Sequence, residues 1–561
     1  MDFLRDRSIK VRVGASHSST YPIENGTPQG SVCSPILFNL MINDVFSGVD
    51  NSLGRSLYAD DGALWARGCN VTILQKKIQV AVNTVEEWGN KWGFRFSVDK
   101  TQVICFSKKR INPKIQINLY GQSVKQALCI RFLGVWMDHK LTYGEHIQKV
   151  ITKCKKAVNI MRCLIGNSWG ASMKSLRHIY TALIRSTLDY ACITYGSAAK
   201  SHLQKLDVIQ AQALRLCCGA FKTSPVPALQ VEAGEMPLSL RRLQLSMTYW
   251  TTLQGHRQEH PTKAVLNKCW EHGRKQFDSF GWVGDSQAET LGLTKISHRC
   301  TVVLSAIPPW FFPMPAVDLE ISKISKHSRE CGGMNNMVQQ YLSDKYNDMV
   351  QIYTDGSKDP DTGRTGAAVY IPEFDISIKQ RTSDNLAVYS VELLAILLAL
   401  IKIEDFKTNK FVVCSDSMAA LVSILNLQST CRLDLVYDIF QSLYRLSHRD
   451  TTVCFIWVPA HVEVDGNEVV DSLAKKALSM NSNQLDVPLS RNEIKTIIKA
   501  KVNNLWQKQW HTNSKGRFLH KIQQQVPSKR RGNWSRRGET IITRLRIGHS
   551  NLNYNLNIAQ E

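Results

Sequence analysis

The chain has 561 residues, more than a single hydrophobic core usually supports, so its length favours three or four domains. Hydrophobic residues make up 43% and charged residues 21%, values close to ordinary globular usage that exclude a wholly disordered chain. The formal net charge of +23 favours polyanionic partners such as nucleic acid, although a generally basic solvated surface would give the same balance.

The cysteines and the apolar runs bear on the compartment. The 15 cysteines include no Cys-x-x-Cys pair, which favours reduced thiols in the cytosol or nucleus. No apolar signal core follows Met1, and the longest apolar stretch, Leu393 to Ile401, is too short to span a bilayer. We therefore expect a nuclear or cytoplasmic location, or both, and no membrane partner.

Residues 1–142 alternate short apolar runs with Gly and Pro, which predicts mixed α and β structure. The segment Asn25 to Ser31 leads into an apolar helical run. Asp60 and Asp61 lie between apolar residues at the tip of a predicted hairpin. Adjacent aspartates at such a tip can present carboxylates to metal-bound triphosphate, but they also occur in ordinary turns.

Residues 143–253 are predicted to be helical, because helical spacing dominates from about Tyr143 to Arg215. One predicted helix face carries Ile147, Val150, Ile151, Cys154, Val158 and Met161. Lysines occupy the positions between them. A basic face lying on nucleic acid and a solvated outer face both fit this pattern. Residues 254–345 have little periodicity, so we predict a connecting region of uncertain fold.

A regular alternation of strands and helices occupies residues 346–480. Four stretches within it each contain one acidic residue that could belong to a shared site. Asp355 follows a strand-like run and is expected at a strand end or turn. Glu392 lies in the first turns of an apolar helix, after a plausible Ser390 cap. Asp416 ends another strand, and Asp471 lies in a helical pattern. Each acid alone could be a turn former, a helix cap or an exposed helix charge.

Together the four acids predict one shared site. Crowded carboxylates repel one another unless cations neutralise them, and oxygen-rich sites suit Mg²⁺ or Mn²⁺. Two such ions about 4 Å apart can activate water and stabilise the leaving oxygen in phosphodiester cleavage.

The same stretches resemble a known family in order and spacing. They are Tyr353–Ser357, Val391–Glu392, Ser415–Ser417, Trp457–His461 and Gly466–Asp471, and they are similar to the RNase H domain. The resemblance implies an α/β fold with a mixed five-stranded sheet over residues 346–480. It also implies that Asp355, Glu392, Asp416 and Asp471 hold the metal ions, and that His461 assists proton transfer or product release. Glu463 and Val470 depart from the family pattern, but neither replaces a metal ligand.

The amino-terminal region resembles the palm of reverse transcriptases. Pro28, Gln29 and Gly30 match the segment that lies against template and incoming nucleotide, and the Tyr58–Asp61 loop matches the one that supplies two metal ligands, Asp60 and Asp61. Phe132, Leu133 and Gly134 are similar to the primer-grip hairpin, and residues 143–253 take the thumb's place. Palm, thumb, RNase H and a basic tail at 481–561 resemble, in this order, the second open reading frame of a Jockey-like non-LTR retrotransposon (LINE).

The resemblance also implies an aspartate on an earlier palm strand, and Asp2 and Asp6 lie too close to Pro28 to supply it. We therefore expect a truncated palm that does not synthesise DNA alone. In the tail, Lys529, Arg530 and Arg531 could form a nuclear import signal or contact phosphates.

The function that these motifs predict is two-metal hydrolysis of the RNA strand of an RNA/DNA hybrid. One alternative is a non-catalytic nucleic-acid-binding remnant, with Trp534 stacking on bases and the surrounding arginines neutralising phosphates. Another is an active reverse transcriptase, if upstream sequence supplies the missing aspartate. The sequence does not indicate an oligomeric state.

Overall fold

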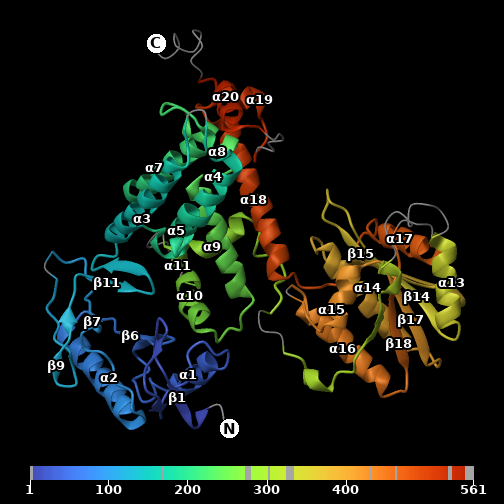
Figure 1. Cartoon of the computed structure of the whole chain (residues 1–561), viewed down its shortest axis with the longest axis horizontal. Helices are drawn as coiled ribbons and strands as arrows, with labels where there is room; N and C mark the ends of the chain where they lie inside the picture. Colours follow the sequence, from blue (N-terminus) through green and yellow to red (C-terminus); the bar gives the residue numbers. More distant parts are fainter. Residues whose placement is uncertain are drawn as a thin grey trace. The chain divides into compact units, whose positions relative to one another are not determined.

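The structure is a computed structural model that describes residues 4–110, 112–166, 169–271, 279–300, 304–323, 334–429, 431–460, 464–527 and 534–549. The chain divides into two compact units. The first comprises Met1–Lys156 and Ala198–Leu206, and the second comprises Ala157–Ser197 and Asp207–Glu561. Figure 1 labels the helices and strands of both.

The first unit consists of short strand pairs around two helices, α1 and α2. Its elements are β1 (Arg7–Ile9), β2 (Arg12–Val13), β3 (Ser16–His17), β4 (Tyr21–Ile23), α1 (Ser34–Ile42), β5 (Gly54–Tyr58), β6 (Asp61–Trp65), α2 (Val71–Trp92), β7 (Gln102–Val103), β8 (Asn118–Leu119), β9 (Gln122–Ser123), β10 (Lys125–Gln126), β11 (Cys129–Phe132), β12 (Val135–Asp138) and the first part of α3 (Gly144–Cys163). The core lies between α1 and α2, where Ile42, Val45 and Trp88 are buried together. This core supports the β5–β6 hairpin through Leu57.

Helices form the next part of the chain. They are α4 (Met173–Ile179), η2 (Tyr180–Arg185), α5 (Ser186–Asp189), α6 (Cys192–Tyr195), α7 (Lys200–Cys218), α8 (Val226–Ala233), α9 (Leu238–Gln254), α10 (Pro261–Glu271) and α11 (Phe280–Thr290). Those within residues 143–253 agree with the prediction, whereas the helices at 261–271 and 280–290 lie where the sequence shows little periodicity. The six apolar residues predicted to share a face of α3, from Ile147 to Met161, are all buried.

A six-stranded mixed sheet is the centre of the remaining chain. Its elements are η3 (Pro309–Phe311), β13 (Ala316–Asp318), η4 (Glu320–Lys323), α13 (Met334–Tyr346), β14 (Val350–Lys358), β15 (Thr365–Ile371), η5 (Pro372–Phe374), β16 (Ile376–Thr382), α14 (Val388–Ile403), β17 (Lys410–Ser415), α15 (Met418–Leu425), α16 (Leu433–Ser447), β18 (Thr452–Trp457) and α17 (Asp465–Ala477). The strand order is β13-β18-β17-β14-β15-β16. The first four strands in this order are parallel to one another, and β15 runs antiparallel to both β14 and β16.

The sixth strand corrects the prediction of five. It is β13, which pairs with β18 and comes from residues 254–345, where the sequence shows little periodicity. Three residues are too few for a period-two pattern to be visible. Asp318 at the end of β13 accepts hydrogen bonds from the hydroxyls of Tyr341 and Tyr346 and from the Lys345 ammonium group. These bonds attach β13 to α13.

Two helices cover opposite faces of the sheet, and glycines let them approach the strands. A Cβ at Gly356 of β14 would lie 2.6 Å from the backbone nitrogen of Glu392 in α14. A Cβ at Gly366, which pairs with Ser357, would lie 2.6 Å from the Ala477 side chain in α17. Because Gly356 and Ser357 are consecutive, their side-chain directions alternate, so α14 and α17 lie on different faces. Figure 1 shows α14 and α17 on either side of the strands.

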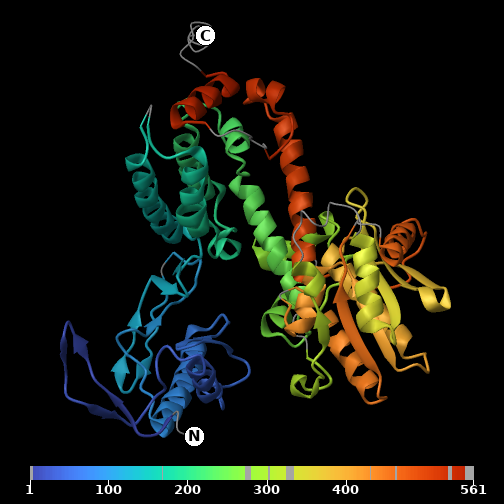
Figure 2. The same cartoon turned by 45° about the vertical axis from the view of Figure 1, so that its right-hand side comes forward.

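Residues 481–549 fold onto the rest of the second unit. They form α18 (Arg491–Thr512), α19 (Arg517–Ile522) and α20 (Arg536–Ile547), and Figure 2 shows α18 as one long helix with α19 and α20 beyond its end. Arg536, one of the arginines near Trp534, is buried. Its guanidinium donates to the carbonyls of Leu216 and Cys217 at 2.7 Å each, at the end of α7.

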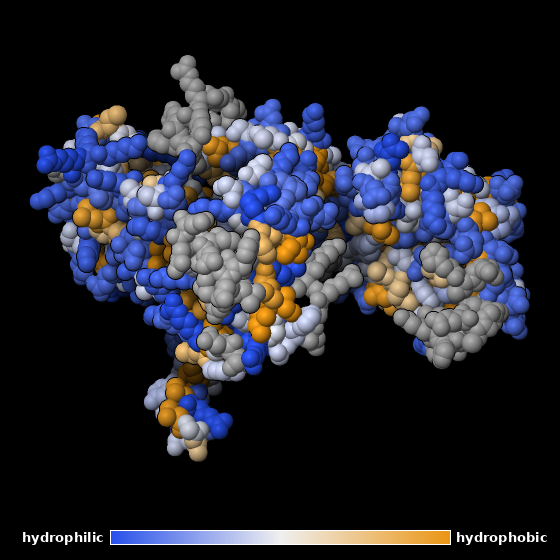
Figure 3. Space-filling view, turned by 90° about the horizontal axis from the view of Figure 1, so that it is seen from above, coloured by the Kyte–Doolittle hydropathy of each residue, from blue (hydrophilic) through white to orange (hydrophobic). Residues whose placement is uncertain are grey.

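The surface drawn in Figure 3 is mainly hydrophilic, with smaller hydrophobic patches between the hydrophilic residues. Within the described part of the chain, no helix is both long enough and apolar enough to cross a bilayer.

Replacing Gly356 with alanine is expected to separate α14 from β14. The new Cβ would press on α14 backbone atoms that cannot rotate away, so we expect a local loss of about 1–3 kcal/mol. Hydrogen exchange of peptides from β14 and α14 in the full chain measures this loss. Gly538→Ala is the matched control, because its Cβ would make only ordinary contacts of 3.6 Å or more. Unchanged exchange in β14 of the Gly356 variant would contradict the close-approach argument.

Candidate metal centre

Adjacent parallel strands bring Asp355 and Asp416 to the same end of the sheet. Thr354 of β14 pairs with Ser415 of β17, so the next residue of each strand follows at the same level. The sequence placed Asp355 at a strand end or turn, which is wrong: β14 continues to Lys358, because it still pairs with β15 beyond its contact with β17. Asp416 directly follows β17, as predicted, and its carbonyl accepts a hydrogen bond from the Trp457 indole at 3.0 Å.

Glu392 reaches the same place from the first turns of α14. Ligand oxygens of Asp355, Glu392 and Asp416 all lie within 4.8 Å of one another. The proposed Ser390 cap is wrong. The N-cap of α14 is Ala387, which has no side chain to cap the helix, and Ser390 lies inside the first turn. The helix therefore begins earlier than its apolar pattern indicates.

Asp471 lies beside this group without belonging to it. It occupies the middle of α17, and its carboxylate accepts a hydrogen bond from Lys475, one turn further along, at 2.6 Å. Its charge is close enough to contribute to raising the pKa values of Asp355 and Glu392. The geometry thus gathers three of the four predicted acids and places the fourth at their border, paired with an ammonium group.

Burial makes this cluster costly when no cation neutralises it. Burial first, and then the charges of Asp416 and Asp471, raise the pKa of Asp355 to about 7. Burial and the charges of Asp355 and Asp416 raise the pKa of Glu392 well above its usual value. One carboxylate oxygen of Glu392, Oε2, is buried and has no hydrogen-bond partner among the described residues.

These observations fit a hard divalent cation. The donor set consists of carboxylate oxygens, which Mg²⁺ and Mn²⁺ prefer. A cation there would neutralise the repulsion between the acids and give Glu392 Oε2 the partner that it lacks within the described chain. The cluster is therefore chemically suited to hold a divalent metal.

The other predicted site residues lie elsewhere. His461 and the Lys529–Arg531 run fall outside the described residues. Asp60 and Asp61 are exposed at the β5–β6 turn, where Ala59 has a φ of +51°. Pro28, Gln29 and Gly30 form a turn before α1, closed by a hydrogen bond from Ser31 to the Pro28 carbonyl. Phe132, Leu133 and Gly134 end β11 and turn the chain into β12.

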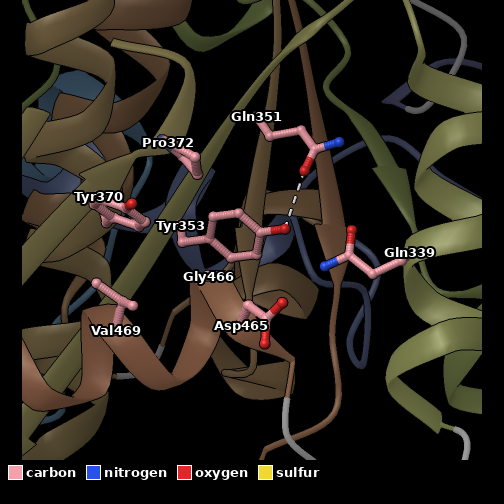
Figure 4. Close-up of a pocket in the computed structure, with 8 residues that line it drawn as sticks. All are labelled: Gln339, Gln351, Tyr353, Tyr370, Pro372, Asp465, Gly466 and Val469. Atoms are coloured by element: carbon pink, nitrogen blue, oxygen red, sulfur yellow. Dashed lines mark hydrogen bonds between the residues drawn. The ribbon is translucent and has the colours of Figure 1, made fainter. Parts of the chain in front are cut away.

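A separate pocket of about 210 Å³ lies beside the first turn of α17. Figure 4 shows Gln339, Gln351 and Asp465 around the Tyr353 hydroxyl, which donates to Gln351 at 3.0 Å. Gly466 lies under the Tyr353 ring, where a Cβ would be only 2.3 Å from the ring. None of the three clustered acids lines this pocket, so it is distinct from the candidate metal centre.

Sequence reasoning missed two charged residues that contact the site or its helix. Lys475 lies four residues after Asp471, a spacing that alone predicts an ion pair on one helix face. Glu493 lies beyond the predicted domain and accepts hydrogen bonds from the start of α14. The Ser490–Glu493 capping box was visible in the sequence, but it predicts only the start of α18.

Comparisons with known protein families agree with the fold. Residues 2–137 match the family model of reverse transcriptase (RNA-dependent DNA polymerase), and residues 347–479 match that of RNase H. Both are families of enzymes. The matches confirm the α/β multidomain class and the predicted combination of a reverse transcriptase region with an RNase H domain.

Curated relatives come from mobile elements. The RNA-directed DNA polymerase from mobile element jockey of Drosophila melanogaster is 29% identical over 225 residues, covering 39% of this chain and 24% of that protein. A probable RNA-directed DNA polymerase from transposon BS of the same species is 27% identical and covers 38% of this chain and 24% of its own length. The chain thus spans about a quarter of these relatives. These similarities confirm the resemblance to non-LTR retrotransposon polyproteins.

Solved structures with a similar domain include the amino-terminal RNase H domain of a Mycobacterium tuberculosis protein. It is 18% identical and covers 23% of this chain and 94% of that one, with a TM-score of 0.19. RNase H1 from Halobacterium salinarum is 19% identical, covers 23% and 97% of the two chains, and also has a TM-score of 0.19.

Replacing Asp355 with asparagine is expected to stabilise the metal-free protein at high pH. The pKa of Asp355 is raised, so the folded state disfavours its charged form, and the wild type loses stability as the pH rises from about 4 to about 7. Asparagine removes this loss. At pH 8 in EDTA, the free energy of unfolding of the variant should therefore exceed that of the wild type by about 2–4 kcal/mol. Calorimetry of the full chain at pH 5 and pH 8 measures the gain. Millimolar Mg²⁺ should stabilise the wild type and not the variant, and a wild type that does not respond would count against the metal centre.

Proposed function

We propose that this chain hydrolyses the RNA strand of an RNA/DNA hybrid, with two divalent metal ions held by Asp355, Glu392, Asp416 and Asp471. The observation that carries the proposal is the convergence of three of these acids to within 4.8 Å, inside the region that matches RNase H. When bound, such ions supply an activated water and stabilise the leaving oxygen of the phosphodiester.

Residues of this chain hold the acidic side chains in position. Asp355 lies within a strand hydrogen-bonded on both sides, so its carboxylate has a rigid base. Glu392 is fixed by the close contact of its helix with Gly356. Asp471 is held by Lys475, whose ammonium group balances its charge before metal binds. By family resemblance, His461 assists proton transfer or product release.

The proposed substrate follows from the family resemblance and from charge. An excess of 23 positive charges favours a phosphate backbone, and the 2′-hydroxyls of one strand distinguish a hybrid from duplex DNA.

For the reverse transcriptase region, we propose that this chain alone does not extend a primer. In the described residues, no group of three metal-ligating side chains includes Asp60 or Asp61, whereas polymerisation by two metals requires a further carboxylate. The region then serves to bind nucleic acid.

Hybrid cleavage gives the direct test. With Mg²⁺, the full chain should cut the RNA strand of a labelled hybrid, and Asp416→Asn should lower the rate at least 100-fold because a metal ligand loses its charge. Asp405→Asn is the control, since this exposed aspartate just after α14 pairs with Lys402 and should leave the rate unchanged. Equal cutting by wild type and Asp416→Asn would sink the assignment. Hybrid binding without cutting by the wild type would instead favour a non-catalytic remnant.

Primer extension tests the polymerase proposal. On an RNA template with a DNA primer, the full chain should give no more product than a double variant carrying Asp60→Asn and Asp61→Asn. Extension by the wild type that the double variant abolishes would show that the chain contains a complete polymerase site.

A further inference from the structure

A buried carboxylate from outside the RNase H match contacts the helix that carries Glu392. Glu493 lies in the first turn of α18, beyond residue 479 where the match ends, and is 5% exposed. Its Oε1 accepts hydrogen bonds from the Ala387 backbone N–H at 2.8 Å and from the Ser390 hydroxyl at 2.6 Å. Ala387 is the N-cap of α14 and has no capping side chain of its own. Glu493 therefore accepts the backbone N–H of the N-cap residue, as the acid of a capping box does.

The other oxygen of Glu493 is fixed as well. Oε2 accepts the Ser490 backbone N–H at 2.7 Å and lies 3.4 Å from the guanidinium of Arg432, which is fully buried. Arg432 also pairs with Asp434 at 2.9 Å, and Asp434 pairs with Arg299 at 2.5 Å. The network balances two arginines against two carboxylates, so the Glu493 charge is compensated where it lies.

The contact matters because of where it acts on α14. Ser390 is two residues before Glu392, so Glu493 holds the turn from which Glu392 projects. That turn must stay close to β14, since Gly356 leaves no room for a side chain between them. Burial and the charges of Asp355 and Asp416 disfavour the ionised form of Glu392 at this position.

The other end of α18 is anchored independently. Trp506 and Trp510 are buried, and the Trp510 indole donates to the Gln523 carbonyl at 2.8 Å. Gly516 lies against both Trp510 and Ala228 of α8, where a Cβ would be 3.1–3.2 Å from their side chains. A shift of α18 along its axis would expose these tryptophans, so Glu493 has a fixed support.

We propose that Glu493 is a positioning residue for the metal centre. It contacts the start of α14 and thereby holds the Glu392 carboxylate within reach of Asp355 and Asp416. The inference rests on the proposed function, because it assumes that these acids bind a divalent metal. It also means that residues 347–479 alone lack a group that the centre needs.

Binding of Mn²⁺ to the full chain without nucleic acid, followed by electron paramagnetic resonance, tests the proposal. Glu493→Ala removes both contacts to α14 and should weaken Mn²⁺ binding about tenfold, as loss of supporting partners typically does. Glu493→Gln keeps an oxygen for Ala387 and Ser390 while losing the charge opposite Arg432. It should therefore lower the melting temperature yet keep Mn²⁺ affinity within about threefold of the wild type, a separation that a purely structural role would not give.

Glu539 offers a matched control. Its carboxylate accepts the Met173 backbone N–H at 2.7 Å, at the start of α4, which carries none of the clustered acids. Glu539→Ala should lower stability and leave Mn²⁺ affinity unchanged. Equal Mn²⁺ affinity in the wild type and Glu493→Ala would overturn the inference.

If Glu493→Ala does not fold, Ser390→Ala decides the question. It deletes one hydroxyl contact without leaving a buried charge unpaired, and it should weaken Mn²⁺ binding a few-fold. Unchanged affinity in that variant would overturn the inference. A wild type that binds no Mn²⁺ overturns the proposed function itself, whereas normal binding and cleavage in every Glu493 and Ser390 variant overturns only the positioning role.

Discussion

The repulsion between buried carboxylates is the constraint around which the second unit is organised. Asp355 and Glu392 are both buried, and the charges of Asp355 and Asp416 add to the cost of ionising Glu392. A fold gains nothing from such a cluster in itself, because hydrophobic residues in the same place would pack at no electrostatic cost. The surrounding structure must therefore supply the energy that holds the acids together, and strand pairing, close helix packing and the capping of α14 each contribute.

Close approach of main chains is the first of these contributions. Gly356, Gly366 and Gly466 each lie where a Cβ would be within 2.6 Å of a neighbouring element. Because these glycines have no side chain, α14 can pack closely on one face of β14 and α17 on the other. Because Glu392 and Asp471 lie on these two helices, the same packing sets how far Asp471 lies from the clustered acids. A sheet with larger side chains at these positions would hold its helices further away and disperse the charges.

The sequence predicts those parts of this arrangement that depend on neighbouring residues, and it does not predict those that depend on contacts with distant segments. Asp416 was placed correctly, because a short apolar strand ends where its pairing ends. Asp355 was placed at a turn because Gly and Ser follow it, yet pairing with β15 carries the strand three residues further. Ser390 has the residue type of a cap, but tertiary contact with Glu493 starts α14 earlier. β13 was missed because its pairing partner lies more than 100 residues away. Local patterns were sufficient where local forces decide, and failed where a distant segment completes a strand or a helix end.

The buried residues of α18 explain how one helix can contact different neighbours at its two ends. Five buried residues of α18 follow one another at intervals of four: Ile494, Ile498, Val502, Trp506 and Trp510. Because the helix has 3.6 residues per turn, each interval advances about 40° around the axis. The buried stripe therefore turns by about 160° over the length of the helix. Its first turn contacts α14 and Arg432, and Trp510 in its last turns lies against Gly516 and donates to the Gln523 carbonyl. A stripe that stayed on one side could bury itself against only one partner. The sequence-distant residues 481–549 are thus part of the same packed structure as the helix that carries Glu392.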